Sequence, residues 1–310
     1  MSDKLVIATR SSPLALWQAE WVKGKVMERF TDLTVELLHI KTKGDKILDT
    51  PLAKIGGKGL FTKELEVAIL QGEADIAVHS MKDMPIELPE GLEISVITKR
   101  ETPEDAFVSN KFKTFDSLPE GAVVGTSSLR RVAQLQNKRR DLSFQSLRGN
   151  VNTRLRKLDE GVYDAIILAS AGLIRLGMEN RITEHLDHQT SLPAIAQGVV
   201  CIESRINDER VLSLINFLKH GTTDLAVRAE RALLHRLNGG CQVPLAGHAV
   251  LDGSRINMSG LVASPDGMKM IRLEEDGSTE DPESIGIRLG ERLLNQGGRE
   301  ILASVGIETH

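Results

Sequence analysis

The sequence predicts an α/β protein in which mainly parallel sheets are followed by a separate α+β module. Short apolar runs alternate with segments of helical spacing over most of the chain, and polar or charged residues directly follow several of these runs. The C-terminal part changes to apolar runs separated by Asp-Gly pairs. Alternating strands and helices favour a parallel sheet covered by helices, whereas Asp-Gly between two strands favours a hairpin.

The N-terminal segment begins this alternation. Residues 4–9 form an apolar run typical of a buried strand, and Ser12 followed by Pro13 is typical of a helix start. Serine caps the free N–H groups of the first turn, and proline lacks an N–H that this turn does not need. The next expected elements are a strand at 35–40, a helix at 60–71 and a strand at 75–79.

The middle of the chain repeats the design, and the C-terminal part departs from it. Strands are expected at 122–126 and 165–169, with helical spacing at 129–136 and after Ser170. The expected C-terminal elements are a helix at 222–237 that stops at Asn238-Gly239, three strands separated by 252–253 and 266–267, and a helix at 282–295. Functional residues of parallel sheets gather at the carboxyl ends of strands. The residues expected there are Arg10, Lys82, Asp83, Ser128 and Ser170.

Composition excludes several classes of protein. A chain of 310 residues favours two or three domains. A net charge of −4 and an aromatic content of 3% disfavour a general nucleic-acid binder. The sequence has no apolar run of the length that a membrane helix needs, and its N-terminus has no secretory signal. Two cysteines exclude a disulfide scaffold and a four-thiolate zinc site, so a reducing cytoplasm is expected.

Positive charge concentrates between Arg130 and Lys157, where nine Lys and Arg residues occur. A solvated helix face explains residues 138–140. Arg130 and Arg131 differ, because they lie in the first turn of a helix, where free N–H groups already favour an anion. Arginine in this position opposes the helix dipole, which indicates a bound anion. Guanidinium groups bind both carboxylate and phosphate, so both remain open.

Two further residues could carry chemistry. Asp83 follows a buried strand, and its carboxylate is suited to accept N–H donors or to stabilise a developing cation. The alternative is a turn-forming aspartate before Pro85. Cys241 follows two glycines that leave room for a bulky group near the sulfur, although a lone cysteine is commonly a small buried hydrophobic residue. Cys201 lies in an apolar run and is expected in the core.

The remaining patterns are weaker. Lys54 and Lys58 stand among glycines without the spacing of a P-loop, so this segment is either a mobile lid or a plain surface loop. His185 and His188 are three residues apart with no third ligand in evidence, and no metal is expected.

Several motifs together resemble the porphobilinogen deaminase family, and they run through nearly the whole chain in the family's order. They are ATRSSPLALWQ (8–18), GGKGLFTKELE (56–66), DIAVHSMKDMP (75–85), GTSSLRR (125–131), LRGNVNTRLRKL (147–158), AGLIRLG (171–177), LPAIAQG (192–198) and ERALLHRLNGGCQVPLA (230–246). The last motif is specific enough to indicate this family by itself.

The resemblance implies a fold and an activity. The fold would have two domains like those of periplasmic binding proteins with mainly parallel sheets, and a third α+β domain with a three-stranded antiparallel sheet. The implied domains are 1–98 with 199–216, then 104–192, then 221–310. The enzyme would join four porphobilinogen molecules head to tail onto a covalent dipyrromethane, releasing ammonia at each step, and would then hydrolyse off linear hydroxymethylbilane. It would act in the cytoplasm as a monomer, with no nucleic-acid or membrane partner.

The resemblance also implies residue roles. Asp83 would be catalytic, Cys241 would hold the dipyrromethane cofactor by a thioether, and Lys54 and Lys58 would belong to a lid. The implied cofactor and substrate contacts are Arg10, Ser12, Gln18, Lys82, Thr126, Ser127, Ser128, Arg130, Arg131, Arg148, Arg154, Arg175 and Gln197. Each ring of such a substrate brings an acetate and a propionate, which fits the arginine cluster. The rivals are a non-catalytic bilobal protein that binds an anionic ligand, and a nucleic-acid binder that uses residues 130–157.

Overall fold

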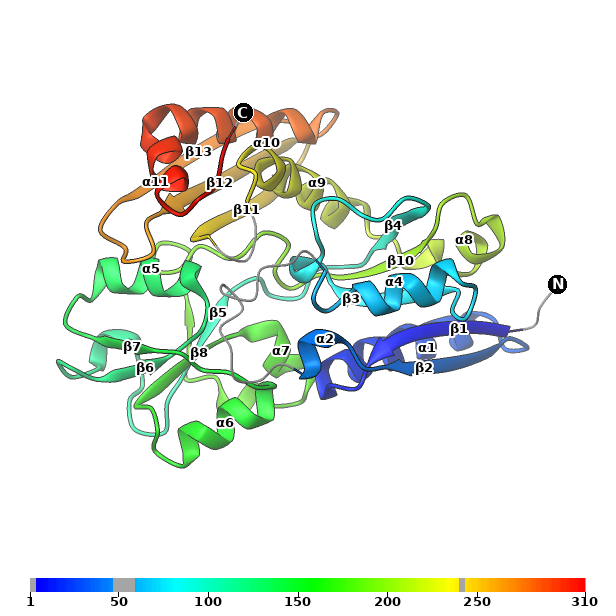
Figure 1. Ribbon diagram of the computed structural model, residues 1–310, viewed down its shortest axis with the longest axis horizontal. Helices are drawn as coiled ribbons and strands as arrows, with labels where there is room; N and C mark the ends of the chain where they lie inside the picture. The colour runs from blue at the N-terminus through cyan, green and yellow to red at the C-terminus, as the bar shows by residue number, and fades with distance from the viewer. Residues whose placement is uncertain (1–3, 47–58, 240–242, 310) are drawn as a thin grey trace. The chain divides into compact units, whose positions relative to one another are not determined.

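A computed structural model describes residues 4–46, 59–239 and 243–309 of the chain. The chain divides into two compact units. Unit 1 comprises Met1–Thr50, Lys54–Glu101 and Val199–Asp224, and unit 2 comprises Pro51–Ala53, Thr102–Gly198 and Leu225–His310. The described residues form a five-stranded sheet in unit 1, and a five-stranded and a three-stranded sheet in unit 2 (Figure 1).

The sheet of unit 1 has the strand order β2-β1-β3-β10-β4. Its strands are β1 Lys4–Arg10, β2 Thr34–Ile40, β3 Ile76–Ser80, β4 Leu92–Ile97 and β10 Val200–Arg205. β1 pairs in parallel with β2 and β3, whereas β10 runs antiparallel to β3 and β4. The sheet is therefore mainly parallel, with one strand that returns from a distant part of the sequence.

Helices cover both faces of this sheet. Side chains alternate between the two faces along each strand, so a strand that is apolar throughout needs cover on both sides. Leu5 and Ile7 lie in a core with residues of α1 Pro13–Arg29 and α8 Glu209–Ile215. Ala8 and Ala77 lie in a second core with residues of α4 Lys63–Leu70. A four-residue helix, α2 Lys43–Lys46, follows β2.

The five-stranded sheet of unit 2 has the same mixed design, in the order β7-β6-β8-β5-β9. Its strands are β5 Asp105–Val108, β6 Val123–Gly125, β7 Ser143–Gln145, β8 Ala165–Ala169 and β9 Glu184–Leu186. β6 is parallel to β7 and β8, and β5 is antiparallel to β8 and β9. α5 Leu129–Lys138 packs on one face; α6 Val151–Asp159 and α7 Ser170–Arg175 pack on the other.

The three-stranded sheet of unit 2 is antiparallel throughout. Its strands are β11 Leu245–Asp252, β12 Arg255–Ala263 and β13 Met270–Ser278, and the accompanying helices are α9 Gly221–Arg236, α10 Pro282–Leu293 and α11 Arg299–Ser304. Ala133 of α5 shares a core with Ala246, Leu261 and Ala263 of this sheet. α5 therefore contacts both sheets of unit 2, and it lies between them in Figure 1.

The predicted fold class is confirmed. The strand at 165–169, the helix start at Pro13 and both Asp-Gly hairpins are observed, and Asn238 takes the left-handed backbone conformation (φ 47°) that ends α9. Helix α4 begins three residues later than predicted, at Lys63. The predicted division into three domains stays a prediction.

Candidate functional site

The first group of candidate residues lies at the carboxyl ends of the parallel strands of unit 1. Arg10 is the last residue of β1. Lys82 and Asp83 belong to η1 Met81–Asp83, one turn of 3₁₀ helix that directly follows β3. Asp83 is exposed and Lys82 is half-buried. Because β1 and β3 are parallel, both ends lie at the same edge of the sheet. The edge therefore presents an accessible carboxylate next to two cationic residues of the chain.

The turn that carries Asp83 is anchored where the chain leaves β3. Gln18, buried on α1, donates from Nε2 to the Ser80 hydroxyl at 2.8 Å. The Met81 backbone N–H donates to the Val199 carbonyl at 2.9 Å, which extends the β3–β10 pairing up to the turn. Ser12 caps α1, and its hydroxyl accepts from the Ala15 N–H at 3.4 Å. The bonds at Ser80 and Met81 fix the backbone that leads into Asp83.

Arg10 has an anionic partner within the chain. Its guanidinium bonds the Asp45 carboxylate of α2 through Nε (3.3 Å) and Nη2, and it lies 4.3 Å above the Phe61 ring. Burial alone would raise the pKa of Asp45. The hydrogen bonds from Arg10 and Thr42 outweigh it and hold the pKa of Asp45 below its ordinary value. Arg10 is thus held in a fixed orientation at the end of β1.

The second group lies at the corresponding edge of the five-stranded sheet of unit 2. Thr126, Ser127 and Ser128 connect β6 to α5. The Thr126 hydroxyl accepts from the Ser128 N–H at 3.3 Å, and the Ser127 hydroxyl donates to the Leu147 carbonyl at 2.8 Å. Thr126 is buried, Ser127 is exposed and Ser128 is half-buried. The connection therefore offers hydroxyl and backbone N–H groups at the start of α5.

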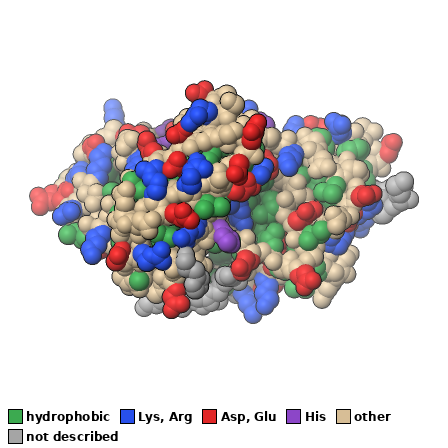
Figure 2. All heavy atoms as spheres, turned by 90° about the horizontal axis from the view of Figure 1, so that it is seen from above, with side chains coloured by type: hydrophobic (Ala, Val, Ile, Leu, Met, Phe, Trp, Pro, Cys, Tyr) green, Lys and Arg blue, Asp and Glu red, His purple; other side chains and the backbone are tan. Residues whose placement is uncertain are grey.

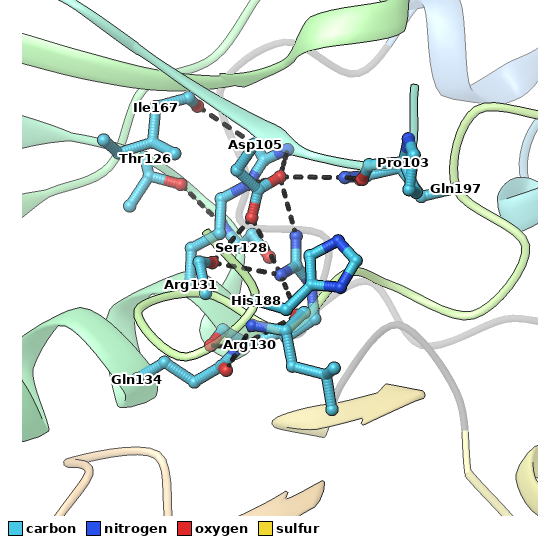
Figure 3. Close-up of polar contacts among 12 residues, drawn as sticks. Pro103, Asp105, Thr126, Ser128, Arg130, Arg131, Gln134, Ile167, His188 and Gln197 are labelled. Carbon is cyan, nitrogen blue, oxygen red and sulfur yellow. Dashed lines mark hydrogen bonds and ion pairs between the residues drawn. The ribbon is translucent and has the colours of Figure 1, made fainter. Parts of the chain in front are cut away.

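Asp105 is the centre of a buried polar network in unit 2 (Figure 3). It is fully buried at the start of β5, opposite Ala169 at the end of β8. Arg130 reaches Asp105 at 2.8 Å from Nη1 and 3.1 Å from Nη2. Arg131 donates to the same carboxylate at 2.9 Å from Nε and 2.7 Å from Nη2. Ser191 and Gln197 complete the network at 2.7 Å and 2.9 Å.

This network determines the charge state of its members. Burial by itself would raise the pKa of the Asp105 carboxyl, but the charges and hydrogen bonds of Arg130 and Arg131 hold that pKa far below its ordinary value. Asp105 is therefore ionised, and two guanidinium groups share one carboxylate, which leaves one net positive charge. The anion that faces these arginines in the structure is a carboxylate of the chain itself.

The other predicted arginines of unit 2 are only half-buried. Arg154 donates to the Gly149 carbonyl at 2.8 Å, and Arg175, the last residue of α7, donates to the Gly198 carbonyl at 2.7 Å. Arg148 precedes α6, and its carbonyl accepts from Lys157 at 3.4 Å. The predicted site arginines of unit 2 thus comprise a buried pair held by Asp105 and three side chains with partial access to solvent.

Three predicted residues lie outside the described part of the chain: Cys241, Lys54 and Lys58. Cys201 is buried in β10, as predicted. His185 contacts Ser170 and Glu104, whereas the His188 ring stacks edge-on against His248 with centroids 4.8 Å apart. The described residues include no group of three side chains arranged to hold a metal ion.

Sequence reasoning missed the acidic partners of the arginines. Asp105 and Asp45 were not among the predicted site residues, although each binds one that was. A signal for Asp105 existed: it is an acidic residue at the start of the apolar run DAFV, whose four residues are all buried. A carboxylate in such a strand requires a buried cation, which the sequence alone could not locate.

Two family models match this chain. The model described as "Porphobilinogen deaminase, dipyromethane cofactor binding domain" matches residues 5–213, and the model described as "Porphobilinogen deaminase, C-terminal domain" matches residues 225–295. The chain belongs to the porphobilinogen deaminase family. It is thus a transferase of tetrapyrrole and haem biosynthesis, a hydroxymethylbilane synthase that joins four porphobilinogen molecules onto a covalent dipyrromethane with release of ammonia. The alternative function, a non-catalytic protein that binds an anionic ligand, is not favoured.

Similar solved structures include bacterial solute-binding proteins. A putative methionine-binding lipoprotein from Bacillus subtilis has a TM-score of 0.46 and 12% identity, with 70% of this chain and 90% of that chain covered. A nutrient binding protein from Burkholderia cenocepacia bound to methionine has a TM-score of 0.44 and 13% identity, with 68% and 90% covered.

The described residues of unit 2 fit a polycarboxylate cofactor. Dipyrromethane built from porphobilinogen has an acetate and a propionate on each ring. Unit 2 provides hydroxyl groups at 127–128, half-buried arginines and the net charge of the Asp105 network. These are the donors that bind carboxylates best. None of the helices in the described part of the chain has the length and apolar character needed to span a membrane.

Proposed function

We propose that Asp83 is the catalytic carboxylate of the condensation, and that the cations and hydroxyls of unit 2 hold the substrate and cofactor carboxylates. The observation that carries this proposal is the position of Asp83. It is an exposed carboxylate on a turn fixed by the Gln18–Ser80 and Met81–Val199 hydrogen bonds. A group fixed in this way can stabilise charge without reorganising during the reaction.

Asp83 suits the charge that develops in this reaction. Loss of ammonia from porphobilinogen leaves a cation spread over the pyrrole ring and its methylene carbon. A carboxylate accepts a hydrogen bond from the pyrrole N–H and stabilises that cation. The same carboxylate can accept the proton that is lost when the new carbon–carbon bond has formed and the ring becomes aromatic again. Lys82 and Arg10, beside it, would bind substrate carboxylates.

The remaining roles follow from the resemblance and from the geometry of unit 2. When bound, dipyrromethane supplies the pyrrole carbon to which the first substrate is joined. We assign the attachment of dipyrromethane, by a thioether, to Cys241. We assign Lys54 and Lys58 to a lid over the site. Ser12, Gln18 and Gln197 would have supporting roles in the site. The groups assigned to its carboxylates are Thr126, Ser127, Ser128, Arg148, Arg154 and Arg175. Arg130 and Arg131 contribute the net charge of the Asp105 network.

We further propose a cytoplasmic monomer without a nucleic-acid partner. A net charge of −4 argues against a nucleic-acid partner, as does the interspersed distribution of acidic and basic side chains on the face shown in Figure 2. The cytoplasmic location and the monomeric state rest on the family resemblance.

Replacement of Asp83 by Asn tests the proposal. Asp83→Asn removes the negative charge from an exposed position, so we expect a folded protein whose kcat falls by roughly 10²–10³ or more. The matched control is Asp32→Asn, an exposed aspartate of the same unit in the turn between α1 and β2, which should keep parental turnover. Steady-state formation of hydroxymethylbilane gives kcat, and circular dichroism gives the folded fraction. A near-parental kcat for Asp83→Asn would refute the proposed role.

A further inference from the structure

Three ionisable side chains are buried between α4 and the sheet of unit 1, near enough for the charges of the other two to act on the first. They are Glu66 of α4, His79 of β3 and Glu203 of β10, with exposed fractions of 5%, 6% and 0%. The pairing of Ala77 with Glu203 and of His79 with Cys201 places the His79 and Glu203 side chains on the same face of the sheet. Neither the proposed chemistry nor the resemblance assigns a role to this cluster.

The cluster contains one ion pair and one extra carboxylate. His79 Nε2 lies 3.0 Å from Glu203 Oε2. Within the described residues, Glu66 Oε1 and Glu203 Oε1 are buried and have no hydrogen-bond partner. With both carboxylates ionised and His79 protonated, the cluster would hold one uncompensated negative charge away from water, which is costly.

A proton on Glu66 removes this charge. The protonated carboxyl is neutral, and it gains an O–H donor where the ionised form has only acceptors. Burial is the largest influence that raises the pKa of Glu66 above its ordinary value, and the negative charge of Glu203 raises it further. The Thr62 hydroxyl and the charge of His79 act in the opposite direction, and they do not outweigh burial.

Among the described residues, the other charged groups near the cluster do not supply the missing cation. Glu64, on the same helix, is acidic and raises the pKa of Glu66 further. Arg205 follows Glu203 by two residues on β10, but it bonds the Ile69 and Ala74 carbonyls and the Asp208 carboxylate. Arg10, at the end of β1, is held by Asp45. The surrounding core of α4, β1, β3 and β4 is apolar and comprises Ala8, Leu65, Ala68, Ile69, Ala77 and Leu92.

The cluster lies directly behind the turn that carries Asp83. His79 is followed by Ser80 and then by η1 Met81–Asp83, so a bond at His79 restrains the strand that leads into the turn. We propose that protonated Glu66 packs against the His79–Glu203 ion pair, and that these three positioning residues lock α4 onto the strand leading into Asp83. Ionisation of Glu66 weakens the lock. The protonation does not depend on the proposed function, whereas the effect on catalysis rests on it.

Stability as a function of pH tests the protonation. Because the folded pKa of Glu66 is raised, the parent loses stability as pH rises from the unfolded value of about 4.5 through the folded value. Glu66→Gln keeps a neutral side chain and removes this loss. We expect the ratio of the folding constants of Glu66→Gln and the parent to rise up to tenfold per pH unit across that window. The control is Glu73→Gln, which changes an exposed glutamate just after α4 and should show the parent's pH dependence of stability. Urea unfolding from pH 4 to 9 measures the stability of the parent and of each variant.

Infrared difference titration of the folded protein provides a direct readout. The parent should show a protonated carboxyl that persists above the ordinary glutamate range, and Glu66→Gln should lack it. In Glu203→Gln, this carboxyl should ionise at lower pH, because the repelling charge is gone. A Glu66→Gln stability profile parallel to the parent's, or absence of the protonated carboxyl in the parent, overturns the proposal.

The pH profile of kcat tests the positioning role separately. We expect kcat of the parent to fall at alkaline pH, and this fall to be reduced in Glu66→Gln but not in Glu73→Gln. An unchanged alkaline limb in Glu66→Gln refutes the positioning role. If the parent had no synthase activity, the proposed function would fail while the stability and infrared titrations still decided the protonation.

Discussion

At the residue scale, single carboxylates of the chain orient several of its arginines. Asp105 accepts hydrogen bonds from two arginines, a serine and a glutamine. Asp45 accepts hydrogen bonds from the Arg10 guanidinium. A buried guanidinium needs such a partner, because the cost of removing it from water exceeds any gain from apolar packing. Asp105 therefore determines the orientation of Arg130 and Arg131, and Asp45 that of Arg10.

Removing the charge of Asp105 should destabilise the fold in a pH-dependent way. Asp105→Asn leaves two buried guanidinium groups without an anion, which typically costs about 3–5 kcal/mol at neutral pH. Since the pKa of Asp105 is lowered in the folded state, its stabilisation is present above the unfolded value of about 3.8 and is lost as pH falls below it. The acid-induced loss of stability should therefore be shallower in Asp105→Asn than in the parent.

Urea unfolding at several pH values measures this difference. The control is Asp141→Asn, which removes the exposed carboxylate partner of Arg139 in the same unit and should change stability little. Equal losses in both variants would contradict the central role of Asp105.

At the element scale, α5 links the arginine pair to the antiparallel sheet. Its first turn carries Arg130 and Arg131, and its Ala133 packs on the other side against Leu261 and Ala263. The β12–β13 turn also touches the helix: Asn137 donates to the Gly267 carbonyl at 2.8 Å. Within unit 2, the position of the arginine pair thus depends on the packing of the antiparallel sheet.

A side chain at Gly267 should disturb this packing. Gly267 has a positive φ of 68°, and a Cβ built on it would lie 2.3 Å from the Ala133 carbonyl oxygen. Gly253, in the β11–β12 turn, has a similar φ of 58° but nothing within 4 Å of its Cβ position. Gly253→Ala should therefore cost only the backbone strain, about 1–2 kcal/mol. Gly267→Ala should cost a further 1–3 kcal/mol or so from overpacking. Thermal unfolding compares the two, and equal Tm values would show that the turn moves aside without cost.

At the scale of the whole molecule, the chain combines a net charge of −4 with a local concentration of arginine. The buried part of that concentration is partly neutralised by Asp105, and unit 2 also has half-buried arginines and the hydroxyls of 127–128. Such an arrangement suits a small polycarboxylate better than an extended polyanion, which requires a continuous basic surface.

Intact mass tests cofactor attachment in the whole protein. The purified parent should be heavier than its chain by one dipyrromethane, and Cys241→Ser should have the mass of the chain alone. Cys201→Ser is the matched control: it alters the buried cysteine of β10 and should keep the added mass. The same added mass on Cys241→Ser would exclude Cys241 as the attachment site.

The sequence by itself determined the fold class and the residues that gather at strand ends. Alternating apolar runs, the Ser12–Pro13 helix start and the two Asp-Gly turns are local signals, because each depends on backbone propensity and short-range periodicity. They predicted β1, α1, β8 and the C-terminal hairpins, and the motifs around Asp83 and Cys241 indicated the family.

Tertiary structure alone decided which charges meet. Asp105 lies 25 residues from Arg130 and 86 from Ser191, and Glu203 lies 124 residues from His79. β10 enters the first sheet from a distant part of the sequence, and it runs antiparallel to its neighbours. Local propensity cannot predict contacts between residues so far apart in the sequence. They arise because burying the apolar faces of strands brings distant polar groups together, and buried charges persist only where they find partners.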